Sequence, residues 1–170
     1  GHEVVSVSRS GPATVVDGVQ YEIGNAEQVA PRAIPGADAV VAALSPRGTT
    51  AGRLVEVYGT LARLSADAGA RYLQVGGFSS LRPAPDAPRF AEGEIPAEYR
   101  DEAVEGEATR AMLAEGAPDE LDWLFVSPPA AYGSFNPGER RGTYRVGGDV
   151  ALFDEAGESH ISGADFALAI

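Results

Sequence analysis

The sequence predicts an α/β fold, a doubly wound parallel sheet, on three observations. Short apolar segments alternate along the chain with segments of helical period, which is the pattern of repeated strand–helix units. The segment 37–44 (ADAVVAAL) is almost continuously apolar, as strands buried on both faces of a parallel sheet are. Each strand candidate then ends in small or turn-forming residues, which places a loop after every strand.

Strands and helices alternate clearly through the first half of the chain. The expected elements are a strand over 3–8, a strand over 19–23, a helix ending near Gly36, a strand over 37–44 and a helix over 50–68. In this last helix the apolar residues recur every three or four positions and Gly69 ends it. These elements give the order that parallel sheets with helical crossovers require.

The second half begins and ends with regular elements but contains long loops. We predict a strand over 71–75, a helix over 97–115, a strand over 121–126, short strands over 144–146 and 150–153, and a helix from Ser162 onward. The segment 80–96 contains four prolines and no period, so it is expected to be a long loop above the sheet. Loops of this length in a compact domain are often functional.

Length and composition favour one domain over residues 1–170. With 170 residues and 44% hydrophobic content, the chain can bury one substantial core. It has no cysteine, which excludes disulfides, thiolate metal ligands and a thiol nucleophile. No apolar run is long enough to span a membrane, and the N-terminus lacks a signal-peptide pattern, so a cytoplasmic protein is expected.

The charge of the chain excludes further function classes. Its 13 basic residues are scattered among 25 acidic ones, giving a net charge of −12, which disfavours nucleic acids as partners. Every basic residue is arginine. Without a lysine there is no Schiff-base nucleophile and no lysine to act as a base of lowered pKa.

The residues that follow the strands point to a shared ligand site. Ligands of open parallel sheets bind beyond the carboxyl ends of the strands. The pairs at those positions are Arg9 and Ser10, Gly24 and Asn25, Ser45 and Pro46, Gly76 and Gly77, and Pro128 and Pro129. Small residues let an extended ligand approach the backbone, as a dinucleotide requires. The alternative is that these loops are merely rich in turn residues.

An ordered set of segments carries a resemblance to a known family. HEVVSVSRS, GADAVVAALSP, RYLQVGGFSSL, LDWLFVSPPA and GTYRVGGD followed by SHIS resemble the NAD(P)H-binding atypical short-chain dehydrogenases. This group includes biliverdin reductase B and the flavin reductase-like proteins, and the resemblance covers nearly the whole chain. It implies a Rossmann-type domain that binds a nicotinamide dinucleotide.

The resemblance also implies roles for the residues at the strand ends. An arginine at the position of Arg9 would contact the adenosine 2′-phosphate, which favours NADP over NAD, unless Arg9 is a solvated surface residue. Asn25 would lie near the adenine, or else serve as a turn residue. The remaining expected cofactor-binding residues are Ser10 and Gly24 at the ends of the first two strands, Ala43, Leu44 and Ser45 along the pyrophosphate and ribose, and Gly76, Gly77, Ser127 and Pro128 at the nicotinamide.

Members of this group carry a first strand and a glycine-rich phosphate-binding turn that have no counterpart in this sequence. No GxxGxxG motif occurs anywhere in the chain, and residues 1–3 resemble the entry into the second strand of the family. We therefore expect a domain incomplete at its N-terminus and, because the last helix runs off the end, at its C-terminus. Without the central strand, two half-sheets would expose apolar edges.

The sequence assigns no catalytic residue and no metal site. Tyr99 is followed at the usual lysine spacing by Ala103, so the Tyr/Lys pair of standard short-chain dehydrogenases is missing and Tyr99 is interpreted as a packing residue. Related reductases place a serine where this chain has Gly77, with Ser79 and Ser80 close by, and one relative has a histidine at the position of Ala130. The two histidines, His2 and His160, are isolated, which disfavours a metal.

The predicted function is NADPH-dependent reduction of a small planar acceptor such as a flavin or quinone. The acceptor pocket is expected between the loop 80–96 and residues 132–141, where Phe90, Tyr132 and Phe135 would stack on a ring or cover the core. The alternative is a regulatory module that binds or senses NADP without catalysis, favoured by the missing Tyr/Lys pair. A monomer or homodimer is expected, with no nucleic-acid or membrane partner.

Overall fold

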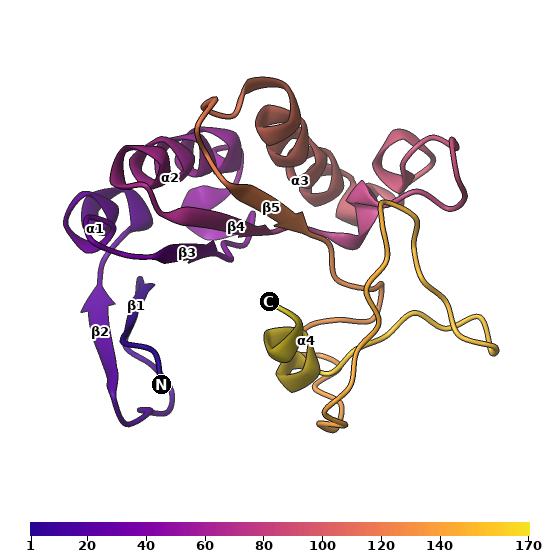
Figure 1. The fold of residues 1–170 in the computed structure, drawn as a ribbon. Coiled ribbons are helices and arrows are strands. Elements are labelled where there is room, and N and C mark those ends of the chain that lie inside the picture. The colour runs from indigo at the N-terminus through magenta and orange to yellow at the C-terminus, as the bar shows by residue number, and fades with distance from the viewer.

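The computed structural model describes residues 1–170, which form two separate parallel sheets joined by helical crossovers (Figure 1). One sheet pairs β1 (Val4–Ser8) with β2 (Val19–Ile23). The other has the order β3-β4-β5, with β3 at Ala39–Ala42, β4 at Arg71–Val75 and β5 at Trp123–Val126. All ladders are parallel, as the sequence predicted.

Most of the helices cover a single side of the strands. They are α1 (Ala26–Ala33), α2 (Leu54–Ala68), α3 (Ala97–Gly116) and α4 (Gly163–Ala169). Figure 1 shows α1, α2 and α3 on one side and α4 on the opposite side, below β5. Gly69 ends α2 in the left-handed conformation with φ 67°, and the Ser162 hydroxyl accepts a hydrogen bond from the Asp165 amide at the start of α4. Both helix ends follow the sequence prediction.

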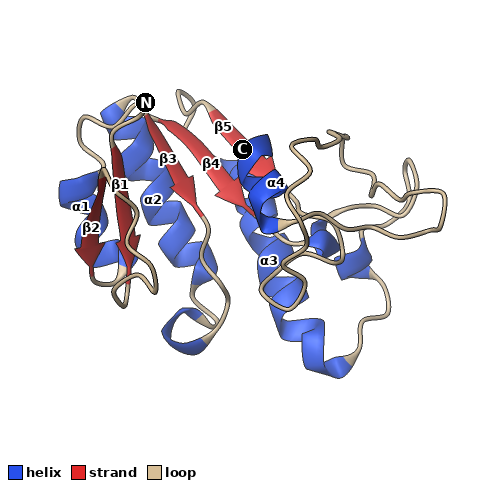
Figure 2. Ribbon diagram, turned by 90° about the horizontal axis from the view of Figure 1, so that it is seen from below, coloured by secondary structure: helices blue, strands red, loops and turns tan.

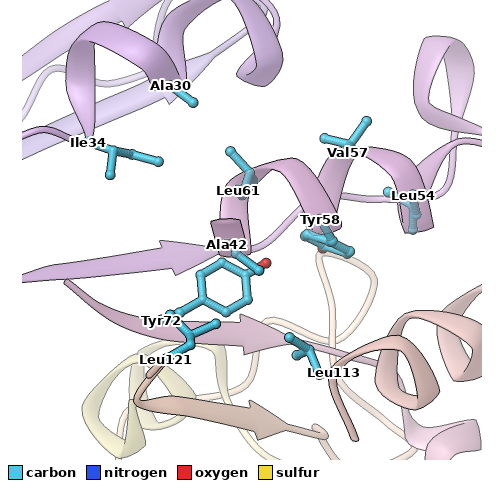
Figure 3. Packing of buried hydrophobic residues seen from close by; sticks show 11 residues of the cluster. Ala30, Ile34, Ala42, Leu54, Val57, Tyr58, Leu61, Tyr72, Leu113 and Leu121 are labelled. Atoms are coloured by element: carbon cyan, nitrogen blue, oxygen red, sulfur yellow. The ribbon is translucent and has the colours of Figure 1, made fainter. Parts of the chain in front are cut away.

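The hydrophobic core lies between α1, α2 and α3 and the helix-facing side of the three-stranded sheet (Figure 3). Its buried members come from α1 and its cap, β3, α2, β4 and α3, with Leu121 before β5, and none comes from β1 or β2. The members are Ala30, Ile34, Ala42, Leu54, Val57, Tyr58, Leu61, Ala62, Tyr72, Leu113 and Leu121. The apolar residues that recur every three or four positions in α2 thus face β3 and β4, as the apolar face of an amphipathic helix on a sheet does.

No ladder joins β1 to β3, and apolar strand residues near the gap are exposed. Val5 of β1 is 41% exposed and Val41 of β3 is 54% exposed. Two half-sheets with exposed apolar residues are the arrangement that the sequence predicted.

Two sequence predictions are wrong in detail. Residues 144–146 and 150–153 form no strand, because they have no extended neighbour to pair with beyond an isolated bridge between Val150 and Arg82. The helix expected from Thr50 begins at Leu54, since Gly48–Thr50 forms a short 3-10 turn and Gly52 has φ 73°. None of the helices combines the length and apolarity needed to cross a bilayer.

Candidate functional site

The candidate site is the edge of the two sheets at which the strands end, here called the carboxyl edge. Figure 2 shows the arrowheads of β1, β2 and β3 pointing toward the same edge. At the end of β1 and β2, the Gly24 amide donates to the Ser8 carbonyl over 2.9 Å, and the Ser8 hydroxyl donates to the Ser10 carbonyl over 2.6 Å. The predicted residues Arg9, Ser10, Gly24 and Asn25 therefore lie together.

A second group of predicted residues gathers at the end of the three-stranded sheet. Ala42 is paired with Gln74, so the residues after β3 lie beside those after β4. The Gly76 amide donates to the Val126 carbonyl over 2.9 Å, which brings the glycine pair next to the residues after β5. Ala43, Leu44, Ser45, Gly76, Gly77, Ser127 and Pro128 thus form one continuous rim.

A hydrogen bond from Arg9 connects the two groups. Its Nη1 donates to the Thr49 hydroxyl over 2.9 Å, and Thr49 follows β3 by seven positions. A Cβ on Gly48 would lie 3.2 Å from the same nitrogen, so the guanidinium rests against this turn. No carboxylate pairs with Arg9, whereas seven other arginines form ion pairs. Sequence reasoning missed Thr49, because 40 positions separate it from Arg9.

The segment 43–53, here called the β3–α2 loop, is fixed by contacts with α3. The Arg47 guanidinium donates twice to the Glu102 carboxylate, over 2.7 and 3.1 Å, and the hydrogen bond and charge of Arg47 lower the pKa of Glu102. The Glu105 carboxylate accepts from the amides of Gly52 and Leu54 at the start of α2, over 3.0 and 2.8 Å. This carboxylate satisfies amides that have no partner within the helix. The loop is thereby held in place without a ligand.

The glycines at the carboxyl edge have different surroundings, so the absence of a side chain matters for a different reason at each position. A Cβ on Gly76 would lie 2.0 Å from the Phe125 ring, and a Cβ on Gly24 would lie 2.8 Å from Val29. Packing within the chain therefore requires both glycines. A Cβ on Gly77 would meet no atom within 4 Å, so that backbone is open to a ligand. Pro128 is buried by the chain itself, so little of its surface can contact a ligand.

Asn25 stands at the N-cap position of α1, but its side chain makes no capping hydrogen bond. Its carbonyl accepts from the amides of Gln28 and Val29, which begin the helix. The side-chain amide is therefore not used as a cap and remains available to a base edge.

The two loops expected to form the acceptor pocket are anchored to different neighbours. In the first loop the Phe90 ring stacks on Phe78 with centroids 4.7 Å apart, and Arg89 is buried with hydrogen bonds to the Ser80 carbonyl and Asp149. In the second loop the Tyr132 ring lies 4.4 Å from Phe166 of α4. These aromatics cover the chain's own residues.

No side chain forms a hydrogen bond with the backbone of Gly77, whose carbonyl accepts from the Ser80 amide over 3.3 Å. Tyr99 is 59% exposed on the first turn of α3, so its interpretation as a packing residue is wrong. It is exposed because α3 begins beyond the edge of the core. The Ser80 hydroxyl is buried and has no hydrogen-bond partner. No catalytic residue can be assigned from these contacts.

Asp154, Glu158 and His160 bring their ligand atoms within 4.8 Å of one another on an exposed turn. Asp154 Oδ1 accepts from the amides of Ala156 and Glu158, over 2.9 and 2.8 Å. The hydrogen bond from Glu158 is the largest of the effects that lower the pKa of Asp154. These hydrogen bonds stabilise a turn, and the turn explains why the three side chains lie close together.

Two open surface hollows lie outside the carboxyl edge. One, of about 370 Å³, is lined by α2 and α3 with Val55, Gly59 and Met112, and the other by residues 113–123. Neither contains a residue of the predicted cofactor set.

Comparisons with known proteins agree with this fold. No family model matches the chain. The uncharacterized protein YwnB of Bacillus subtilis is 31% identical over 175 residues, which cover 100% of this chain and 79% of YwnB.

Three similar solved structures each align with 99% of this chain. A proposed exported protein from Burkholderia pseudomallei has 32% identity, a TM-score of 0.80 and 79% of its own chain covered. A proposed epimerase from Bacteroides thetaiotaomicron has 30% identity, a TM-score of 0.81 and 77% of its own chain covered. A proposed NADH-flavin reductase from Streptococcus pneumoniae has 25% identity, a TM-score of 0.80 and 79% of its own chain covered.

The parallel strands, the crossover helices and the rim of small residues define a Rossmann-type protein, the class to which its solved neighbours belong. The resemblance to atypical short-chain dehydrogenases is thereby confirmed at the level of this class. The chain belongs to the family of YwnB.

Proposed function

We propose that this protein binds NADPH at the carboxyl edge and reduces a small planar acceptor such as a flavin or quinone. The observation that carries the proposal is the state of Arg9, a cation at the end of β1 that has a hydroxyl as its partner and no carboxylate. The name of the Streptococcus pneumoniae neighbour, a proposed NADH-flavin reductase, supports the reaction class.

Arg9 is suited to a phosphate because its charge is not neutralised within the chain. Six of the 13 arginines have no carboxylate within ion-pair distance, and Arg9 is the one of them that directly follows a strand at the carboxyl edge. A guanidinium presents several N–H donors in a fork that matches phosphate oxygens. The Thr49 hydroxyl beside it could donate to the same phosphate. Arg9 would therefore hold the 2′-phosphate that distinguishes NADPH from NADH.

The rest of the rim would hold the remaining parts of the dinucleotide. The open backbone of Gly77 and the exposed Ser45 fit a flat group that approaches closely. When bound, the reduced nicotinamide supplies a hydride to the acceptor. The chain's own residues bind and orient the two molecules, which is the contribution that hydride transfer needs most. Since no Tyr/Lys pair is present, water would supply the proton.

A charge reversal at Arg9 tests the phosphate role. We expect Arg9→Asp to weaken NADPH binding by about 100-fold, since a charged contact is lost and a repulsion added, and NADH binding by less than about threefold. Arg71→Asp is the matched control, because it makes the same charge change at the amino end of β4. Isothermal titration calorimetry gives the dissociation constants of each variant for NADPH and NADH, each compared with that of the wild type. Equal weakening of NADPH and NADH by Arg9→Asp contradicts the assigned role.

A regulatory module that binds NADP without catalysis is the second candidate. It is favoured by the exposed Tyr99, by Ala103 at the position of the usual lysine and by the absence of lysine from the chain. NADPH oxidation measured with flavin and quinone acceptors distinguishes the two candidates. Turnover supports the reductase, and tight NADPH binding with no turnover on either acceptor supports the module.

A further inference from the structure

The hydroxyl of Tyr58 contacts both backbone polar groups of one residue in the β3–α2 loop. The Leu44 amide donates to the Tyr58 oxygen over 2.8 Å, and the Tyr58 hydroxyl donates to the Leu44 carbonyl over 3.0 Å. Tyr58 lies on α2 and is buried in the core (Figure 3). The sequence places Tyr58 only within the predicted helix over 50–68, among the apolar residues that recur with the helical period.

Burial keeps this hydroxyl in its donating form. Desolvation raises the pKa of Tyr58 to about 12, although the hydrogen bond with Leu44 acts in the opposite direction. The phenol therefore stays protonated at any pH at which the protein would be studied.

The two hydrogen bonds occupy the Leu44 amide and one lone pair of its carbonyl, so the amide has no proton left for a ligand. Its neighbour Ser45 is exposed, and its hydroxyl makes no hydrogen bond within the chain. The Thr50 hydroxyl donates to the carbonyls of Ser45 and Arg47, over 2.6 and 2.8 Å. Tyr58 thus fixes the start of the loop from the core, and Thr50 fixes its next turn.

We infer that Tyr58, assisted by Thr50, is a positioning residue for the nucleotide: it holds Leu44 so that Ala43 and Ser45 face the ligand in a fixed geometry. This inference rests on the proposed nucleotide site and adds to it a residue that does not touch the ligand. It also changes the predicted role of Leu44, whose backbone serves the loop and not the cofactor. A loop held before binding loses less conformational entropy when the ligand arrives.

The matched pair Tyr58→Phe and Tyr72→Phe tests this inference. Both remove one buried hydroxyl from the same core, but the Tyr72 hydroxyl donates to Gln74 over 3.2 Å and does not contact the loop. We expect Tyr58→Phe to weaken NADPH binding by about tenfold, because two backbone groups lose their partner. Tyr72→Phe should change the dissociation constant by less than about twofold even if its melting temperature falls.

Two further measurements keep the test decisive. In the wild type, the Leu44 amide should exchange with deuterium slowly, and Tyr58→Phe should accelerate it by about tenfold or more. Thr50→Val should weaken NADPH binding by about threefold. This variant tests the inference if Tyr58→Phe does not fold.

The outcomes separate this inference from the proposed function. If the wild type binds no NADPH, the nucleotide site itself is wrong and the inference falls with it. If the wild type binds NADPH and Tyr58→Phe binds it equally well, only the inference is overturned. Equal weakening by Tyr58→Phe and Tyr72→Phe also overturns it, because the effect would then report general destabilisation, and so does a Thr50→Val variant with unchanged affinity.

Discussion

The two sheets of this protein are built from similar strands but differ in what covers them. In the three-stranded sheet, Tyr72 and Gln74 of β4 are 0% exposed beneath α2 and α3. In the two-stranded sheet, Val4 and Val5 of β1 are 43% and 41% exposed. Both sheets are parallel and both have apolar strand residues. The three-stranded sheet is itself exposed where no helix covers it, at Val41 and Leu124. The covering helices, more than the strand sequence, therefore decide how much apolar surface a strand buries.

Polar contacts take the place of a buried core in the two-stranded sheet. Glu22 of β2 pairs with Arg32 of α1 over 2.8 Å, and Arg9 reaches Thr49. Exposed ion pairs of this kind contribute little to stability. The residue proposed to bind the nucleotide phosphate therefore lies beside the sheet that contributes no residue to the hydrophobic core, and binding regions are commonly of this kind.

The largest difference between the sheets should appear when a methyl group is added at a glycine. Gly76→Ala should destabilise the protein by about 3 kcal/mol, because the new Cβ would overlap the Phe125 ring and force β4 and β5 apart. Gly11→Ala is the matched change beside the two-stranded sheet, where the nearest atom, of Ile23, is 3.8 Å away. Its effect should stay within about 1 kcal/mol. Urea unfolding followed by the fluorescence of Trp123 measures both.

A second substitution identifies the cause of the first effect. Phe125→Leu removes the ring that lies over Gly76, so the double variant should be more stable than the two separate losses predict. If the losses simply add, the contact between the two residues is not the reason for the glycine.

A smaller difference is expected when side chains are shortened. Val57→Ala in α2 should cost about 2 kcal/mol, because its buried methyl groups face the core of the three-stranded sheet. Val5→Ala in β1 should cost less than about 1 kcal/mol, since the side chain is already 41% exposed. The same urea experiment tests both. A larger loss for Val5→Ala would mean that β1 is covered in solution by something that binds across its exposed face.

The sequence predicted the elements best where local pattern and burial agree. The strand over 19–23 and the helix beginning at Ser162 were predicted to within a residue, because turn residues or a capping hydroxyl mark their ends. The late strands failed for the opposite reason: residues 144–146 contain β-forming side chains but no strand lies beside them, and Val146 is exposed. Strand propensity alone does not supply a pairing partner.

The candidate site was predictable only in part. Which residues follow the strands can be read from the chain, since parallel strands bring their ends to one edge. The contacts Arg9–Thr49 and Tyr58–Leu44 could not be read, because they join residues 40 and 14 positions apart. The reason for Gly76 was also hidden: the sequence suggests a ligand, whereas the structure places the Phe125 ring there.

The smallest difference between the sheets should come from their exposed ion pairs, and it should depend on pH. Glu102→Gln removes the negative charge and one of the two acceptors of Arg47, and Glu22→Gln, the matched change, removes the negative charge beside Arg32. Arg47 lowers the pKa of Glu102, so the folded state favours the ionised carboxylate. This contribution is present above the ordinary glutamate pKa of about 4.3 and is lost as the pH falls through the lowered value.

The difference in urea midpoint between the wild type and Glu102→Gln should therefore be small at pH 7 and smaller still at pH 3, at constant salt. High salt at pH 7 should reduce it as well, because both partners are exposed. A midpoint difference that stays the same at both pH values would mean that the glutamine disturbs packing on α3, and that the bond to Arg47 adds nothing to the stability of the β3–α2 loop.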